Sequence, residues 1–252
     1  MDFNTKTVLI TGGSRGIGKA TAIAFAKRGA KVGINFRNNL EEAKKTVTEL
    51  PGEGHEIFQK DISQKENCEE LVADFVNTFG HIDVLVNNAG ISIFHEIDSV
   101  DFDHWTHAWE ETFKTNLFAA TNLSYWAAQA MIKSGGGRIV NVSSRGSFRG
   151  EPTKPAYGAS KAALNAMSQS LAKKLAPYNI YIGVVAPGFT ETEMAAVTLT
   201  PKERENLLRE SPFQRMAQPE EVAHAILFLA SEGAEYTSGT IIDVNGASYL
   251  RS

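Results

Sequence analysis

Short runs of apolar residues alternate with longer helical patterns along the whole chain of 252 residues. Most of these runs are rich in Val and Ile and show little polar–apolar alternation, which is typical of strands buried on both faces of a parallel sheet. Strand–helix repetition predicts βαβ crossovers, and therefore a doubly wound α/β fold of about seven parallel strands with helices on both faces. The predicted strands are residues 6–10, 30–36, 55–59, 82–88, 137–144, 180–187 and 239–246.

No repeat, low-complexity tract or linker interrupts this alternation, so we expect residues 1–252 to form a single domain. The clearest helical patterns are residues 16–30 and 155–176. Residues 200–221 depart from the alternation, because they are highly charged and contain three Pro. This segment is either a pair of surface helices or a lid over a substrate pocket.

Composition narrows the class of protein. A hydrophobic content of 42% is ordinary for a globular chain, and a net charge of −4 argues against a nucleic-acid partner. The one cysteine, Cys68, cannot form an internal disulfide. The first residues lack the pattern of a signal peptide, and no apolar run approaches the roughly 18 residues that span a bilayer. We therefore expect a cytoplasmic protein without a membrane partner.

The segment "TGGSRGIG", residues 11–18, directly follows the first predicted strand and opens the first predicted helix. Gly12, Gly16 and Gly18 allow a tight turn, close approach of backbone to phosphate, and close helix–strand packing. The spacing G-x-x-x-G-x-G departs from the usual G-x-G-x-x-G dinucleotide fingerprint, so a merely structural turn is the alternative. The strand–turn–helix context favours a Rossmann-type nucleotide site, with a pyrophosphate at the helix N-terminus.

The end of the second predicted strand bears on the choice of cofactor. NAD-binding folds usually carry an acid here for the ribose hydroxyls, but this chain has Phe36 and Arg37, with no acid before Glu41. A guanidinium can grip a 2′-phosphate, and Arg15 is a second cation that could reach it. The pattern favours NADP(H) over NAD(H), although Arg37 could also be a solvated loop residue.

The segment "YGASK", residues 157–161, places a Tyr four residues before a Lys. If the segment is helical, Tyr157 and Lys161 lie on one face. Ser143 and Ser144 stand at the carboxyl end of the fifth predicted strand, where ligands bind in such sheets. Asn116 falls within a predicted helix, and "NNAG", residues 87–90, ends the fourth strand.

Taken in order, the motifs "TGGSRGIG", "NNAG", "KTNL", "VNVSS", "YGASK", "VVAPGFTETEM" and "PEEVAHAILFLAS" cover nearly the whole chain. The chain resembles the short-chain dehydrogenase/reductases, and among them it is most similar to the 3-oxoacyl-[acyl-carrier-protein] reductases. The resemblance implies a carbonyl reductase or alcohol dehydrogenase that needs no metal. It implies Tyr157 as acid/base, Lys161 as the cation that stabilises phenolate and binds the nicotinamide ribose, Ser144 as donor to the substrate carbonyl, and Asn116 as holder of a water beside Lys161.

The resemblance also implies a cofactor site, in which Asp61 contacts adenine and residues 187–189 with Thr192 hold the nicotinamide and phosphates. Its full set is Gly12, Ser14, Arg15, Gly16, Ile17, Gly18, Arg37, Asp61, Ile62, Asn88, Ala89, Gly90, Tyr157, Lys161, Pro187, Gly188, Phe189, Thr190 and Thr192.

Some features leave the substrate open. Ala217 and Ala247 replace Gly residues common in the family, and residues 96–113 are longer than usual. A carrier-protein thioester therefore stands beside a sugar, polyol or steroid substrate, and beside a nucleotide-binding regulator without turnover. We expect a homotetramer or homodimer. Residues 145–155 either border the substrate or form a solvated loop. His104 and His107 do not make a closed ligand set, so no metal is predicted.

Overall fold

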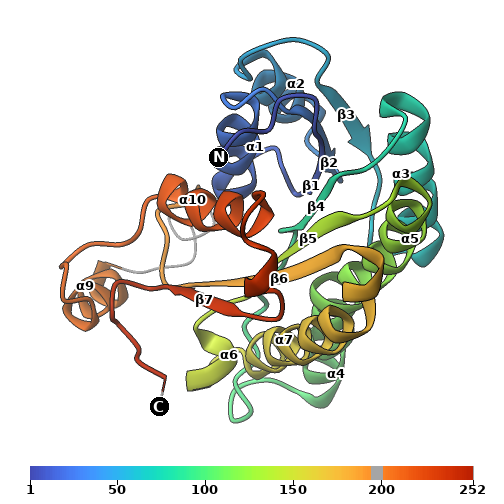
Figure 1. The fold of residues 1–252 in the computed structure, drawn as a ribbon. Helices are drawn as coiled ribbons and strands as arrows, with labels where there is room; N and C mark the ends of the chain where they lie inside the picture. Colours follow the sequence, from blue (N-terminus) through green and yellow to red (C-terminus); the bar gives the residue numbers. More distant parts are fainter. Residues whose placement is uncertain (194–200, 252) are drawn as a thin grey trace.

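The computed structural model describes residues 1–193 and 201–251. Its centre is a sheet of seven strands in the order β3-β2-β1-β4-β5-β6-β7, and all neighbours are parallel (Figure 1). The predicted fold class is confirmed, and each strand falls within its predicted segment or one residue beyond it. The strands are β1 Thr7–Thr11, β2 Lys31–Phe36, β3 Glu56–Gln59, β4 Val84–Asn87, β5 Gly137–Val142, β6 Ile180–Pro187 and β7 Ile241–Val244.

Helices cover both faces of the sheet. Helices α1 and α10 pack together on one face, whereas α3, α5 and α7 lie on the other (Figure 1). The main helices are α1 Gly16–Ala26, α2 Leu40–Thr48, α3 Lys65–Phe79, α4 Phe102–Phe113, α5 Ala119–Ser134, α6 Gly146–Arg149, α7 Pro155–Leu175, α9 Pro201–Glu210 and α10 Pro219–Ala230. Shorter turns are the π-helix η1 Lys114–Phe118 and the 3-10 helices η2 Ala176–Tyr178 and η3 Glu235–Thr237.

Each face of the sheet has its own hydrophobic core. In β1, Val8 and Ile10 belong to the core beneath α1 and α10, whereas Leu9 belongs to the core beneath α3 and α5. All three side chains are fully buried. Successive residues of a strand point to opposite faces, so a strand covered on both sides needs apolar residues at every position. This requirement explains the continuous apolar runs in the sequence.

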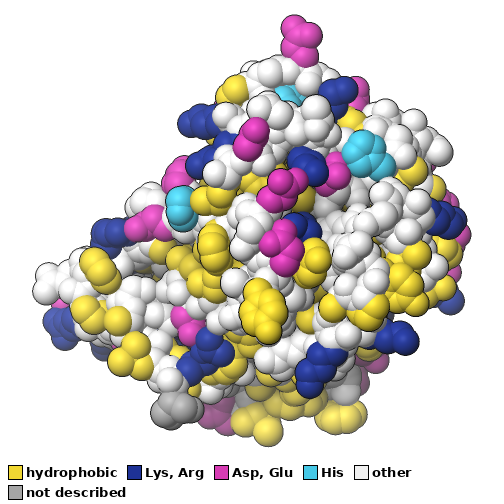
Figure 2. All heavy atoms as spheres, in the orientation of Figure 1, with side chains coloured by type: hydrophobic (Ala, Val, Ile, Leu, Met, Phe, Trp, Pro, Cys, Tyr) yellow, Lys and Arg dark blue, Asp and Glu magenta, His cyan; other side chains and the backbone are white. Residues whose placement is uncertain are grey.

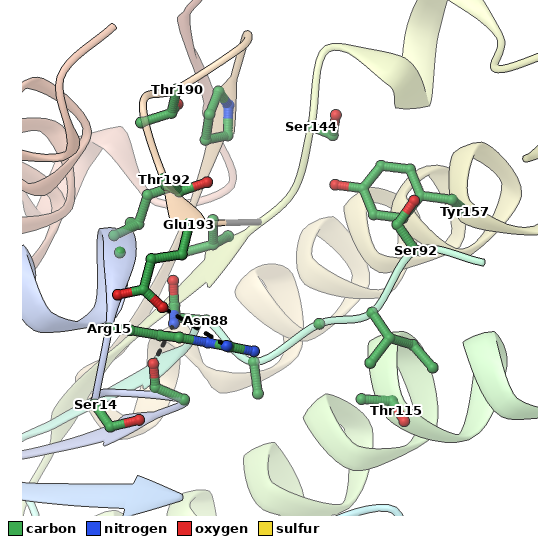
Figure 3. Close-up of a pocket in the computed structure, with 18 of the residues that line it drawn as sticks. Ser14, Arg15, Asn88, Ser92, Thr115, Ser144, Tyr157, Thr190, Thr192 and Glu193 are labelled. Atoms are coloured by element: carbon green, nitrogen blue, oxygen red, sulfur yellow. Dashed lines mark hydrogen bonds and ion pairs between the residues drawn. The ribbon is translucent and has the colours of Figure 1, made fainter. Parts of the chain in front are cut away.

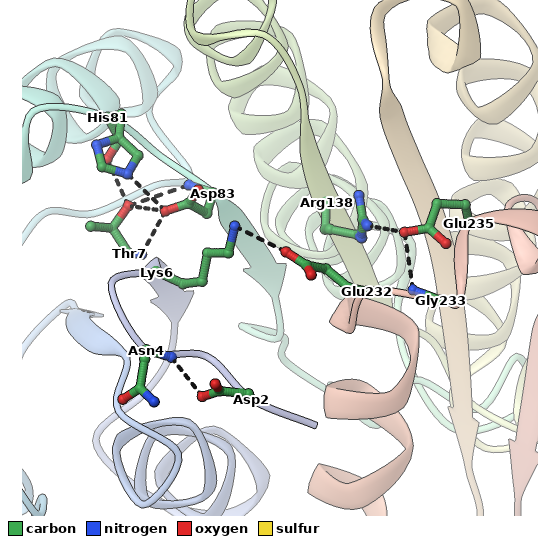
Figure 4. Close-up of polar contacts among 10 residues, drawn as sticks. All are labelled: Asp2, Asn4, Lys6, Thr7, His81, Asp83, Arg138, Glu232, Gly233 and Glu235. Atoms are coloured by element: carbon green, nitrogen blue, oxygen red, sulfur yellow. Dashed lines mark hydrogen bonds and ion pairs between the residues drawn. The ribbon is translucent and has the colours of Figure 1, made fainter.

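Strand order reverses between β1 and β4, because β2 and β3 extend the sheet on one side and β5 to β7 on the other. Such a switch point leaves a crevice at the carboxyl ends of the strands, where α/β proteins bind ligands. The amino ends are tied by polar contacts instead (Figure 4). Asp83 accepts the backbone N–H of Thr7 at 2.7 Å, and Arg138 pairs with Glu235.

The charged segment 200–221 contains one helix, α9, and only the first turn of α10, whose apolar residues pack into the core, so the expected pair of surface helices is not what the segment forms. Residue 200, at the start of this segment, lies outside the described residues. Within the part of the chain that is described, no helix is both long and apolar enough to span a membrane. Charges of both signs are interspersed over the face seen in Figure 2.

Candidate active site

A cleft of about 600 Å³ opens at the carboxyl ends of β1, β2, β4, β5 and β6. Figure 3 shows its interior, with Ser14 and Arg15 at one end and Ser144 and Tyr157 at the other. Of the predicted site residues, Gly18 and Asn116 do not line the cleft. Those that do are Gly12, Ser14, Arg15, Gly16, Ile17, Arg37, Asp61, Ile62, Asn88, Ala89, Gly90, Ser144, Tyr157, Lys161, Pro187, Gly188, Phe189, Thr190 and Thr192.

The glycine turn keeps one end of the cleft open. Gly12 and Gly16 have φ values of 62° and 52°, which favour glycine. A Cβ on Gly16 would come within 3.2 Å of Thr192 Cγ2 across the cleft. A Cβ on Gly18 would stand 2.2 Å from the Gly12 carbonyl oxygen, so Gly18 allows the helix to pack on the turn. No side chain caps the start of α1, which leaves its first N–H groups available to a phosphate.

Asn88 joins the end of β4 to this turn. Its side-chain amide donates to the carbonyl oxygens of Thr11 and Gly12, at 2.9 and 3.2 Å. The Thr11 hydroxyl in turn accepts the backbone N–H groups of Asn88 and Ala89, both at 3.0 Å. These four hydrogen bonds between side chains and backbone hold the phosphate end of the cleft in place, and its residues fit a dinucleotide.

The end of β2 lies beside the same turn. Phe36 is buried, whereas Arg37 is exposed at the cleft and makes no ion pair with any described residue. Arg15 is 3.8 Å from Glu193, and both side chains are mostly exposed (Figure 3). Such a pair is weak and could exchange partners. Asp61 Oδ1 accepts the Ser63 N–H at 3.1 Å, which fixes the turn after β3.

Tyr157 and Ser144 meet at the other end of the cleft (Figure 3). Burial raises the pKa of Tyr157, a hydrogen bond from Ser144 lowers it, and the nearby Glu151 carboxylate raises it. The Ser144 oxygen accepts the Gly146 backbone N–H at 3.0 Å. That bond directs the serine hydroxyl hydrogen toward another acceptor, such as the phenol oxygen or a ligand carbonyl.

Lys161 lies one turn further along α7, as the spacing predicts. It is 4% exposed, and its Nζ lies 5.9 Å from the centre of the Tyr157 ring. Burial lowers the pKa of Lys161 to about 8. Its ammonium donates to the Val142 carbonyl oxygen at 2.8 Å, at the end of β5. A cation thus lies close to the one phenol of the site.

Asn116 lies behind this pair, in a π-helical turn that the sequence did not predict. Its Oδ1 accepts the Ile91 N–H at 2.8 Å, and its Nδ2 donates to the Ile91 oxygen at 3.0 Å and to Ser160 Oγ at 3.2 Å. Asn116 therefore clamps the segment after β4 to the helix that carries Tyr157. Single π-helical turns are often found at functional sites.

The segment 145–155, expected either to border the substrate or to form a solvated loop, contributes Arg145, Glu151 and Lys154 to the lining of the cleft. Arg145 is 3% exposed, so it is not part of a solvated loop. It pairs with Glu210 at 2.7 Å and lies 4.7 Å above the Phe189 ring. Ser92, which lies beside Tyr157 in Figure 3, was missed, because no motif in the sequence marks it.

The histidines considered for a metal have structural contacts. Asp101 caps α4 by accepting the His104 N–H at 2.8 Å, and His104 Nε2 lies 3.0 Å from the Phe94 oxygen. Among the described residues, no group of three or more potential metal ligands comes together.

The switch-point cleft and its glycine turn define a dinucleotide-binding α/β protein. The family model described as short chain dehydrogenase matches residues 6–203. The chain belongs to the short-chain dehydrogenase/reductase family, a family of oxidoreductases that use a nicotinamide dinucleotide.

Individual relatives are similar over nearly their full length. An uncharacterized oxidoreductase of Thermotoga maritima is 40% identical over 256 residues, which cover 98% of this chain and 99% of the relative. The 3-oxoacyl-[acyl-carrier-protein] reductase FabG of the same organism is 39% identical, with 98% of each chain covered. Among solved structures, a short-chain type dehydrogenase/reductase from Mycobacterium ulcerans has a TM-score of 0.91 and 29% identity, and the match covers 100% of this chain and 92% of that one.

Proposed function

We propose that this protein is an NADP(H)-dependent oxidoreductase that interconverts a ketone and a secondary alcohol, with Tyr157 as the acid/base. The observation that carries the proposal is the position of Tyr157 between the Ser144 hydroxyl and the buried Lys161, in the cleft that also holds the glycine turn. Carbonyl reduction requires a proton donor and a dinucleotide-binding site in the same cleft, and both are found here.

In reduction, the hydride would pass to the carbonyl carbon from a nicotinamide bound in the cleft, and in oxidation it would return to that nicotinamide. In reduction, Ser144 donates a hydrogen bond to the carbonyl oxygen, and Tyr157 gives that oxygen its phenolic proton. Burial raises the pKa of Tyr157 in the protein without cofactor, so the phenol is protonated and ready to act as an acid at neutral pH. The Lys161 cation then stabilises the phenolate that remains. In oxidation the same groups act in reverse.

The cofactor-binding set described above would hold the dinucleotide, with the first turn of α1 at the pyrophosphate. Arg37 and Arg15 would bind a 2′-phosphate, because no acid stands after β2 to repel it. Asn116 would hold a water beside Lys161 and so connect it to solvent.

For the substrate, the named relative favours a 3-oxoacyl-[acyl-carrier-protein] thioester, with a sugar, polyol or steroid as the alternative. The two departures from the family differ in how well they fit. Ala217 exchanges backbone hydrogen bonds with Phe189 and Glu191, whereas Ala247 adopts a φ of 57°, a left-handed conformation that favours glycine. We expect the protein to work as a homodimer or homotetramer.

The test is consumption of NADPH and NADH with a panel of ketones that includes a 3-oxoacyl thioester. Tyr157→Phe keeps the ring but deletes the transferable proton, so kcat should fall by about 10²–10⁴ while NADPH still binds. Tyr125→Phe is the matched control, because Tyr125 is 57% exposed on α5 and does not line the cleft. If Tyr157→Phe kept more than about a tenth of kcat, the proton donor would be another group.

A further inference from the structure

The cations that line the cleft differ in whether an acid neutralises them. Most are neutralised or hydrogen-bonded: Arg15 by Glu193, Lys60 by Glu70, Arg145 by Glu210, and Lys161 by the Val142 carbonyl. Two remain, Arg37 and Lys154, and neither makes an ion pair or a side-chain hydrogen bond with any described residue. Arg37 stands at the nucleotide end, where the proposed 2′-phosphate would neutralise it. Lys154 stands at the opposite end.

Lys154 is held next to the proton donor. It is the N-cap residue of α7, three positions before Tyr157. Its ammonium lies 5.5 Å from the centre of the Tyr157 ring and 5.4 Å from that of Phe94. The charge is therefore half-buried between two aromatic rings, which attract it but cannot replace a hydrogen-bond acceptor.

The carboxylate of Glu151, in the same loop, does not fill this role. Glu151 lines the cleft three residues earlier, but its Oε1 is packed against Gly146, where a Cβ on that glycine would come within 2.3 Å of it. No ion pair joins Glu151 to Lys154. Ser92 adds a second unused group, because its buried hydroxyl has no hydrogen-bond partner among the described residues and lies beside Tyr157 (Figure 3).

We propose that Lys154 is a specificity-determining residue that binds a carboxylate on the substrate, so that the ketone reduced here belongs to an oxo acid. This inference rests on the proposed function and narrows its ketone to an oxo acid, in place of the thioester that the named relative favours. The Lys154 ammonium and the Ser92 hydroxyl could each donate a hydrogen bond to one oxygen of a carboxylate. A ketone with only apolar groups beside its carbonyl would offer neither of them an acceptor.

The test compares short oxo acids with their methyl esters. Pyruvate, acetoacetate and levulinate place the carboxylate at three distances from the ketone, and each methyl ester removes the charge and adds one methyl group. The wild-type enzyme should show at least a tenfold higher kcat/KM for one acid than for its ester, measured by NADPH oxidation, which corresponds to about 1.4 kcal/mol. Lys154→Met should reduce this acid-over-ester preference at least tenfold, and Lys154→Arg should keep most of it.

Lys173→Met is the matched control, because Lys173 is an exposed lysine on α7 outside the cleft and should leave the preference unchanged. If Lys154 instead served only the Tyr157 phenolate, Lys154→Met would slow acid and ester equally, and the inference would be overturned. It would also be overturned if the wild type reduced esters or thioesters but no acid, which would leave the proposed function standing. If no ketone were reduced, both would fall.

Discussion

The buried imidazole of His95 gives a sharp test of how Tyr157 is kept in place. His95 is 0% exposed, its Nδ1 lies 2.9 Å from the Ile93 carbonyl oxygen, and its Nε2 lies 3.2 Å from the Ala156 backbone nitrogen. A carbonyl can only accept and an N–H can only donate, so the ring is neutral with its proton on Nδ1. Because Ala156 directly precedes Tyr157, this ring ties the start of α7 to the segment after β4.

His95→Leu would leave the Ile93 carbonyl and the Ala156 N–H without partners in a buried site. Each unsatisfied group costs about 1–3 kcal/mol, so we expect a loss of roughly 2–6 kcal/mol in the free energy of unfolding. A shift of Tyr157 by about 1 Å would lower kcat by up to about 100-fold. Urea unfolding measures the first effect, and kcat at saturating NADPH measures the second.

Two amide variants separate the hydrogen bond from the packing. Gln can place an acceptor near the Nε2 position and so keep the bond to Ala156, whereas Asn can keep only the Nδ1 bond to Ile93. Both lose the edge-on contact with Trp105, 5.3 Å away. We expect His95→Gln to keep most of kcat and His95→Asn to lose at least about tenfold. Equal kcat in the two variants would show that ring packing, and not the bond to Ala156, positions the tyrosine.

Two further predictions concern the cations of the cleft. The wild type should prefer NADPH to NADH at least tenfold in kcat/KM, which corresponds to about 1.4 kcal/mol, and Arg37→Asp should shift the preference toward NADH. Equal kcat/KM values for the two cofactors in the wild type would contradict this prediction. In the protein without cofactor, Lys161 has a pKa of about 8, below its ordinary 10.5. Below pH 8 the buried charge therefore lowers the free energy of unfolding, and this loss of stability decreases as the pH rises to 10.5. Lys161→Met should therefore be the more stable protein at pH 7 by up to about 3 kcal/mol, and this difference should disappear by about pH 10.5. Urea unfolding of both proteins across this pH range measures the difference in stability, and a difference that does not change with pH would refute the prediction. Burial raises the pKa of Cys68 to about 12 in both proteins alike, so Cys68 does not contribute to the difference between them.

The sequence predicted the fold because the fold depends on short-range patterns, whereas most residues of the cleft were predicted from the resemblance to the family. Val8, Leu9 and Ile10 mark a strand covered on both faces, and Gly12 and Gly16 follow in a tight turn where both have positive φ values. Since parallel strands all end at one edge, residues that follow different strands meet there without further information.

The features that were not predicted depend on long-range contacts. The π-helical turn at Asn116 places its side chain against Ile91 and Ser160, which are 25 and 44 residues away. Arg145 is buried by Glu210 from α9, 65 residues further along the chain. Neither contact leaves a periodic pattern in the sequence. A charged loop and a buried ion pair have the same local composition, so only the structure distinguishes them.

The charges that line the cleft also determine which end would bind the cofactor phosphates and which end would bind the substrate. The glycine turn and Arg37 place phosphates at one end, and Lys154 places a substrate carboxylate at the other, with Tyr157 and Lys161 between them. A neutral ketone would leave the ammonium of the half-buried Lys154 without an acceptor, which is unfavourable. An oxo acid satisfies it and at the same time brings its carbonyl to Ser144 and Tyr157. Selection among ketones would then arise from an unpaired charge rather than from the shape of the cleft, and a single substitution at Lys154 should remove it.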